Sequence, residues 1–337
     1  MSTMALRLGY DDLRGVYAIM PTPATEDAGR ADAKFTVDLA ETARATDALI
    51  TDGVDALMIN GTFGEAMSLT DDEWCQFTKT VVDAAGARVP VLAGATTLDT
   101  RSTIERASFA RDVGASGLLL GRPMWNELAP DQVFEFYKSV AEAVPELGIV
   151  IYNNPAAFKS DISVGLWQQL ATIRQVIGGK YGMLDVTYRE AAARVGKRIR
   201  LMPMEINWYT ARCWHPTETV ACWSGGASCD PLPVVRLRDT FLSDDLVEAE
   251  ELTRRLTATY QTFFPPGGER VFRIYNVQVE KARMNAAGYL KAGPSRPPYH
   301  TMPDEFADGA RTAGTRWRAL ADELRAKGPL TVKTRAG

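Results

Sequence analysis

The chain has 337 residues, a formal net charge of −4 and a pI of about 5.5, so it lacks the cationic surface that nucleic-acid binding requires. Hydrophobic residues make up 46% of it, yet no run approaches the ~18 consecutive apolar residues of a membrane span. The length suits one large α/β barrel or two average domains. We therefore expect an enzyme-like globular protein that binds neither nucleic acid nor membrane.

Eight short apolar runs predict β-strands. The runs are nearly continuous rather than alternating, which is typical of parallel strands buried on both faces. The predicted strands cover 15–20, 54–60, 89–95, 116–121, 148–154, 175–181, 198–205 and 218–225.

Helical patterns fill the gaps between these runs. Thr70 followed by acidic residues predicts a helix start, Asp99 and Gly114 bracket a second helix, and Pro130 lies near the start of a third. Eight strand–helix units predict an α/β fold, a (β/α)8 TIM barrel spanning 10–245. A doubly wound sheet is the alternative, although its GxGxxG fingerprint after the first strand is missing.

The β-rich runs stop near residue 245. Three long helical patterns follow at 244–264, 267–290 and 302–326, separated by the breaks "PPGG" and "AGPSRPPY". We expect residues 246–327 to form a C-terminal helical bundle packed on the barrel. Residues 328–337 are expected to be a frayed tail.

Metal and cofactor signatures are missing. The four cysteines form no CxxC pair, and His215 and His300, the two histidines, lie in neither HxH nor HExxH. We therefore expect no metal and no cofactor. Glu65 and Glu205 are the acids best placed for an all-carboxylate magnesium site, which keeps a metal-dependent barrel hydrolase as an alternative. The first ten residues lack a long apolar core, which favours a cytoplasmic location.

Lys180 is the residue most suited to covalent chemistry. The chain has ten lysines against 28 arginines, and Lys180 falls at the predicted end of the sixth strand, where barrel active sites lie. Burial in a barrel mouth would lower the pKa of the amine and free a nucleophile that forms Schiff bases with carbonyl compounds. Gly178, Gly179 and Gly182 are interpreted as clearance for a substrate bonded to that amine.

Two further motifs end neighbouring strands. "YNNP" places the phenol of Tyr152 after the fifth strand, close in the barrel to Lys180 and able to move protons. "NGTFGE" follows the second strand, and backbone N–H groups in such a turn can hold a carboxylate. Thr62 adds a hydroxyl there.

Taken together, these motifs resemble the dihydrodipicolinate synthase / N-acetylneuraminate lyase family of class I aldolases. "GVYAIMPTP", "NGTFGE", "VPVLAGA", "GASGLLLGRP", "YNNP", "GGK" and "RPPY" carry the likeness over most of the chain. The resemblance implies that Lys180 is the Schiff-base lysine and Tyr152 the catalytic tyrosine, with Thr62 as its hydroxyl partner. It also implies that the loop of Gly61, Phe63 and Gly64 binds the substrate carboxylate, and that the chain forms a homotetramer, a dimer of dimers.

The chain departs from the lysine-pathway synthase at several positions. Ala156 and Ala157 stand where the synthase carries an arginine, Phe63 replaces a hydroxyl, and Tyr181 follows the lysine where an acid is common. These departures resemble the hydratase-aldolase branch, which cleaves benzylidenepyruvates in the breakdown of polycyclic aromatics. The best match is 2'-carboxybenzalpyruvate, of phenanthrene degradation. o-Hydroxybenzylidenepyruvate, of naphthalene degradation, is the alternative.

The expected substrate is thus a small keto acid with an aryl group. Lys180 would form an iminium at C2, water held by Asn154 and Tyr152 would add at C4, and retro-aldol cleavage would give an aromatic aldehyde and pyruvate. Trp223 is the candidate wall for the aryl ring, and Asn276 is expected to line the same pocket. Another pyruvate-dependent aldolase or dehydratase, and a non-catalytic keto-acid sensor, are the remaining alternatives.

Overall fold

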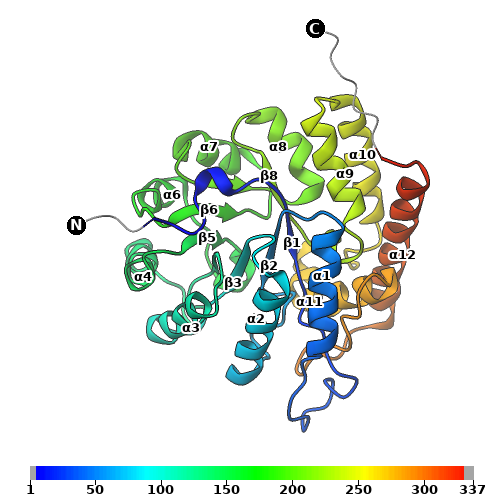
Figure 1. Ribbon diagram of the computed structural model, residues 1–337, viewed down its shortest axis with the longest axis horizontal. Helices are drawn as coiled ribbons and strands as arrows, with labels where there is room; N and C mark the ends of the chain where they lie inside the picture. The colour runs from blue at the N-terminus through cyan, green and yellow to red at the C-terminus, as the bar shows by residue number, and fades with distance from the viewer. Residues whose placement is uncertain (1–4, 330–337) are drawn as a thin grey trace.

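The computed structural model describes residues 5–329. Eight parallel strands run in the order β7-β6-β5-β4-β3-β2-β1-β8. Between the two end strands, the backbone N–H of Trp223 donates to the Pro203 carbonyl (3.0 Å) and Met204 forms an isolated parallel bridge with Trp223. Figure 1 shows the helices around these strands. The fold is therefore the predicted TIM barrel with C-terminal helices.

The strands are shorter than predicted because their last residues turn into the loops that carry polar groups. Asn60, for example, leaves β2 with a φ of 56°, and Glu205 begins a 3-10 turn rather than ending β7. The strands are β1 Gly15–Ile19, β2 Ala56–Ile59, β3 Val91–Gly94, β4 Gly117–Leu120, β5 Gly148–Tyr152, β6 Val176–Lys180, β7 Arg200–Met202 and β8 Ala221–Ser224.

The helix starts follow the predicted capping residues. Thr70 and Glu73 form a capping box, Asp99 accepts a hydrogen bond from the Ser102 N–H, and Pro130 is the first residue of its helix. The barrel helices are α1 Leu39–Thr51, α2 Asp71–Ala85, α3 Thr100–Asp112, α4 Pro130–Ala143, α5 Pro155–Phe158, α6 Val164–Leu170, α7 Val186–Val195, α8 Trp208–Trp214 and α9 Leu232–Leu242.

Side chains alternate between two cores. The larger core lies between the strands and the helices and includes Trp74, Trp167 and Trp208. The smaller core fills the barrel itself and includes Tyr17 and Val150. A filled interior leaves the strand ends as the place where a cavity can open.

Three helices follow the barrel: α10 Leu246–Thr259, α11 Glu269–Ala287 and α12 Asp304–Ala326. They lie together on one side of it in Figure 1. The predicted helix 244–264 is too long, because the chain leaves helix after Thr259 and turns a cluster of aromatic rings inward, among them Phe263. Of the tail predicted at 328–337, residues 330–337 lie outside the described residues.

Residues 5–329 include no helix long and apolar enough to cross a membrane.

Candidate active site

A shift in strand register places Lys180 beside Tyr152. Ile149 of β5 pairs with Val176 of β6, but the next residue, Val150, pairs with Gly178, so β6 contains one extra residue. Beyond this irregularity Tyr152 pairs with Lys180. Such bulges re-aim the side chains that follow them, and here the result is that both functional side chains face the barrel mouth.

Lys180 is buried between aromatic rings. Its Nζ lies 3.5 Å from the centroid of the Trp223 ring and 4.6 Å from that of Tyr152, and the residue is 7% exposed. Burial lowers the pKa of Lys180 to about 7, against the opposing charges of Glu205 and Glu280. Near neutral pH a large share of the amine is therefore unprotonated and nucleophilic.

The Tyr152 hydroxyl is held by two side chains. Its oxygen lies 2.8 Å from the Thr62 hydroxyl and accepts a hydrogen bond from Nδ2 of Asn154 at 3.1 Å. Asn154 also caps α5 by accepting from the Ala157 N–H. Burial raises the pKa of Tyr152, and the bonds from Thr62 and Asn154 oppose that rise. The structure therefore gathers Lys180, Tyr152, Thr62 and Asn154 at one place.

The loop after β2 is a tight turn. A Cβ on Gly64 would lie 3.0 Å from the Asn60 nitrogen, and one on Gly61 would lie 3.8 Å from the Tyr152 ring. Phe63 lines the cavity described below, whereas Gly61, Thr62 and Gly64 lie outside its lining. Within residues 5–329 the Phe63 N–H donates no hydrogen bond, so it is free to bind an anion.

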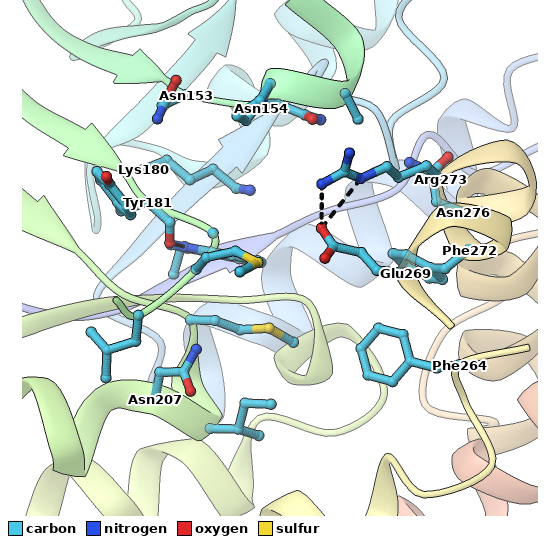
Figure 2. A pocket seen from close by; sticks show the side chains of 18 of the residues that line it. Asn153, Asn154, Lys180, Tyr181, Asn207, Phe264, Glu269, Phe272, Arg273 and Asn276 are labelled. Atoms are coloured by element: carbon cyan, nitrogen blue, oxygen red, sulfur yellow. Dashed lines mark hydrogen bonds and ion pairs between the residues drawn. The ribbon is translucent and has the colours of Figure 1, made fainter. Parts of the chain in front are cut away.

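A cavity of about 690 Å³ opens above Lys180. In Figure 2 the lysine amine points across it toward Glu269 and Arg273 of α11, which form an ion pair (2.6 Å). Its wall is largely apolar. The side chains along it include Phe63, Met183, Met204, Ile206, Asn207, Phe264, Phe272, Arg273, Asn276 and Glu280.

Three of the predicted pocket residues have distinct surroundings. Trp223 lines the cavity, but its ring covers the lysine and its Nε1 donates to the Tyr181 carbonyl at 2.8 Å. Asn276 lines the cavity from α11. The Tyr181 ring is turned away from the lysine amine (Figure 2) and packs against Trp167 and Tyr188. The ring therefore belongs to the outer core, although the residue also borders the cavity.

The glycines around Lys180 differ from the expectation that they give room to a substrate. A Cβ on Gly178 would lie 2.7 Å from Leu13, and one on Gly179 would lie 2.6 Å from Trp167. These two glycines admit the protein's own core side chains. Only at Gly182, which borders the cavity, would a Cβ meet open space.

The two acids considered for magnesium have other partners. Glu65 forms ion pairs with Lys281 (2.6 Å) and Arg296 (2.5 Å), and Glu205 accepts hydrogen bonds from Tyr260 and Gly226. In the described part of the chain, no three His, Cys, Asp or Glu side chains gather in a way that could hold a metal ion.

Much of the cavity wall was not foreseen from the sequence. Glu269, Phe272, Arg273, Asn276 and Glu280 share one face of α11, and only Asn276 was expected to lie there. Their helical spacing was a visible signal. The barrel face against which α11 packs is a tertiary property, so the spacing alone did not lead to the pocket.

Comparison with known proteins gives consistent matches. The model of the dihydrodipicolinate synthetase family matches residues 13–203. A trans-o-hydroxybenzylidenepyruvate hydratase-aldolase of Sphingobium xenophagum is 44% identical, covering 94% of this chain and 97% of its own. A trans-2'-carboxybenzalpyruvate hydratase-aldolase of Nocardioides sp. (strain KP7) is 38% identical, covering 92% and 94%. The solved structure of PhdJ bound to a substrate intermediate has a TM-score of 0.93 at 42% identity, covering 95% and 99%.

The matches to the relatives and to the solved structure extend over barrel and C-terminal helices alike, whereas the family model ends within the barrel. The chain is therefore a lyase of the dihydrodipicolinate synthetase family, in its hydratase-aldolase branch.

Proposed function

We propose that this chain hydrates and cleaves an ortho-substituted benzylidenepyruvate, releasing an aromatic aldehyde and pyruvate, with Lys180 as the Schiff-base lysine. The observation that carries the proposal is the buried Lys180 amine, opposite Tyr152 and at the base of an apolar cavity. An apolar cavity suits an aryl group, and the lowered pKa of Lys180 suits condensation with a ketone.

Binding and condensation come first. The Phe63 N–H and its turn bind the substrate carboxylate. The Lys180 amine attacks the C2 ketone, and loss of water gives an iminium that withdraws electrons through the conjugated alkene. C4 thereby becomes electrophilic, and the aryl ring attached to it lies against the apolar wall that includes Phe264 and Phe272.

Hydration and cleavage follow. A water molecule held by Tyr152 and Asn154 adds its oxygen to C4, and C3 gains a proton. Tyr152 then removes the proton of the C4 hydroxyl with Thr62 as its hydrogen-bond partner. The C3–C4 bond breaks as its electrons pass to the iminium, forming an enamine. The aldehyde leaves, and protonation and hydrolysis of the enamine release pyruvate.

An ortho-hydroxyl substituent fits the wall better than a carboxylate. Glu280 lines the cavity and is paired with Arg283 at 2.8 Å, and burial raises its pKa to about 7, so it can share a hydrogen bond with a neutral phenol, whereas a carboxylate would bring a further charge into a buried site. Two of the hydroxyl-acting relatives are 44% and 41% identical to this chain, the carboxyl-acting one 38%. We therefore place o-hydroxybenzylidenepyruvate first, reversing the order expected from the sequence.

One observation favours 2'-carboxybenzalpyruvate as the second candidate. Arg273 lines the cavity, and its partner Glu269 is half-exposed, so the guanidinium can exchange that partner for a substrate carboxylate. A panel of benzylidenepyruvates bearing ortho-hydroxyl, ortho-carboxyl or no substituent separates the two candidates. If the carboxyl compound has the highest kcat/KM and Arg273→Gln lowers it selectively, the second candidate replaces the first.

Borohydride reduction in the presence of pyruvate tests the Schiff base itself. Reduction of the imine should fix one 1-carboxyethyl group, derived from pyruvate, on the Lys180 nitrogen, visible by mass mapping. Lys180→Arg should take up none. An adduct on another lysine, or none in the unaltered protein, would overturn the assignment.

A further inference from the structure

Glu205 is a buried acid for which the reaction described above has no use. It follows β7, is 0% exposed and does not line the cavity. Its Oε1 accepts hydrogen bonds from the Tyr260 hydroxyl (2.6 Å) and the Gly226 N–H (3.1 Å), both neutral donors, while Oε2 has no hydrogen-bond partner. In the described chain no cation pairs with Glu205, although a buried carboxylate is costly without one.

The strand geometry places this carboxylate at the same end of the barrel as the lysine, after the neighbouring strand. Lys180 pairs with Met202 across β6 and β7, and Glu205 comes three residues later. Its neighbour Met204 bridges to Trp223, whose ring covers the lysine amine. Among the neighbouring charges, that of Glu205 has the largest effect on the pKa of Lys180, and that of Glu280 has the next largest.

The surrounding groups leave Glu205 available to Lys180. Glu280 has its own cation, Arg283, at 2.8 Å. Burial keeps the Cys222 and Cys229 thiols neutral by raising their pKa values, that of Cys229 to about 12. The titratable groups that interact with the Glu205 charge are Lys180 of β6, Cys222 of β8, Cys229 after it, Tyr260 at the end of α10 and Glu280 of α11. Arg283 of α11 pairs with Glu280 and lies over the Tyr260 ring, 4.7 Å from its centroid.

We propose that the Glu205 carboxylate is the fixed counter-charge of the iminium that forms on Lys180, a positioning residue that does not touch the substrate. Condensation of a neutral amine with a ketone takes up one proton and releases one water, so a positive charge appears in a buried site. A carboxylate held in place by Tyr260 and Gly226 stabilises that charge without reorganising. The inference rests on the proposed function of Lys180.

Glu205→Gln tests this inference because it keeps an oxygen that accepts from Tyr260 and Gly226 but removes the charge. Loss of a nearby negative charge lowers the pKa of Lys180 further, so the acidic limb of kcat/KM should move to lower pH by about one unit. The same loss destabilises the iminium, so kcat should fall by about tenfold or more and less pyruvate should be trapped by borohydride. Glu280 offsets part of this shift in the pKa of Lys180. Without Glu205 the pKa of Glu280 falls, so Glu280 carries more negative charge near the lysine.

Three variants separate charge from packing. Tyr260→Phe removes the hydrogen bond but keeps the carboxylate, and Glu205→Asp keeps the charge. Both should retain the acidic limb. Glu73→Gln removes another buried carboxylate, that of α2, which accepts hydrogen bonds from Thr36 and Thr70, and it should lower Tm without moving the acidic limb.

The outcomes are distinct. If Glu205→Gln keeps the limb and the trapping of the unaltered protein, or if Tyr260→Phe moves the limb equally, the inference is wrong. Should Glu205→Gln fail to fold, the variants that keep the charge provide the test: an acidic limb that moves in Glu205→Asp or in Tyr260→Phe would contradict the inference. Absence of a Lys180 adduct in the unaltered protein is a different result and would overturn the proposed function instead.

Discussion

At the residue scale, burial decides the chemistry of Lys180 and Tyr152. Both lie in the barrel mouth and are less than a tenth exposed. Burial lowers the pKa of Lys180 and raises that of Tyr152, so both shifts favour the neutral form. A neutral amine is the nucleophile that Schiff-base formation requires, and a neutral phenol with two hydrogen-bonding neighbours can exchange protons with substrate.

The pH dependence of kcat/KM follows from Lys180. Because the pKa of a basic group is lowered to about 7, the reactive neutral amine is present above pH 7 and is lost as the pH falls through it. We expect kcat/KM to fall about tenfold for each pH unit below this limb. Steady-state rates between pH 5 and 9 would check this, and a limb near the ordinary lysine pKa would contradict it.

Tyr152→Phe should separate proton transfer from Schiff-base formation. The variant loses the hydroxyl that contacts Thr62 and Asn154, so cleavage should slow by about 10²-fold or more, while the pyruvate adduct on Lys180 persists. Tyr137→Phe is the matched control, since this buried hydroxyl donates to the Leu120 carbonyl, interacts with Arg122 and does not line the cavity. Full cleavage activity in Tyr152→Phe would remove the tyrosine from the mechanism.

At the scale of elements, the extra residue in β6 and the C-terminal helix α11 build the site. The register shift after Ile149 brings Lys180 opposite Tyr152. Gly178 and Gly179 allow that strand to pass between core side chains. From the other side, one face of α11 supplies the polar end of the cavity, with Glu269, Arg273 and Asn276 (Figure 2).

The packing of β6 can be tested with two alanine substitutions. Gly179→Ala would place a methyl group 2.6 Å from the Trp167 ring, so it should lower the free energy of unfolding by about 1–3 kcal/mol. Gly182→Ala meets open space and should leave stability within about 0.5 kcal/mol. Urea denaturation of both measures this, and equal stabilities would contradict the role assigned to Gly179.

At the scale of the whole molecule, a buried ionic cluster ties the C-terminal helices to the barrel. Glu65, next to the turn after β2, bonds to Lys281 of α11 and to both the backbone and the guanidinium of Arg296. All three side chains are at most 2% exposed. The cluster thus links the C-terminal part of the chain to the loop that is proposed to bind the substrate carboxylate.

Breaking this cluster should affect both stability and binding. Glu65→Ala leaves Lys281 and Arg296 as buried charges without their shared acid, so the free energy of unfolding should fall by about 3–5 kcal/mol. The turn at Phe63 would also lose its anchor, which should raise KM for pyruvoyl substrates. Thermal unfolding and steady-state kinetics check the two effects, and an unchanged Tm would contradict the role of the cluster.

We also propose that the chain assembles as a homotetramer. The proposal rests on the family resemblance, which implies a dimer of dimers. Light scattering coupled to size exclusion should give four times the chain mass of 36.9 kDa. A single species at the mass of one chain would contradict the proposal.

The sequence alone predicts the strand–helix order, the capping residues at Thr70 and Asp99, and the groups at Lys180, Tyr152 and Thr62. Apolar runs and caps are local signals, and each of these groups lies at a strand end, where barrel chemistry occurs. The predicted ends of the strands and of α10 were less accurate, because the residues that leave regular structure there contact side chains distant in the sequence. The Tyr181 ring, for example, packs against Trp167 and Tyr188.

What the sequence by itself determined is therefore the barrel, its helical extension and the place of Lys180 at a strand end, since period, composition and strand-end position are all local. Only the tertiary structure decided the surroundings of that lysine: the register that pairs it with Tyr152, the ring of Trp223 over its amine, and the α11 face across the cavity. These depend on which surfaces pack together, and burial among them sets the pKa of Lys180.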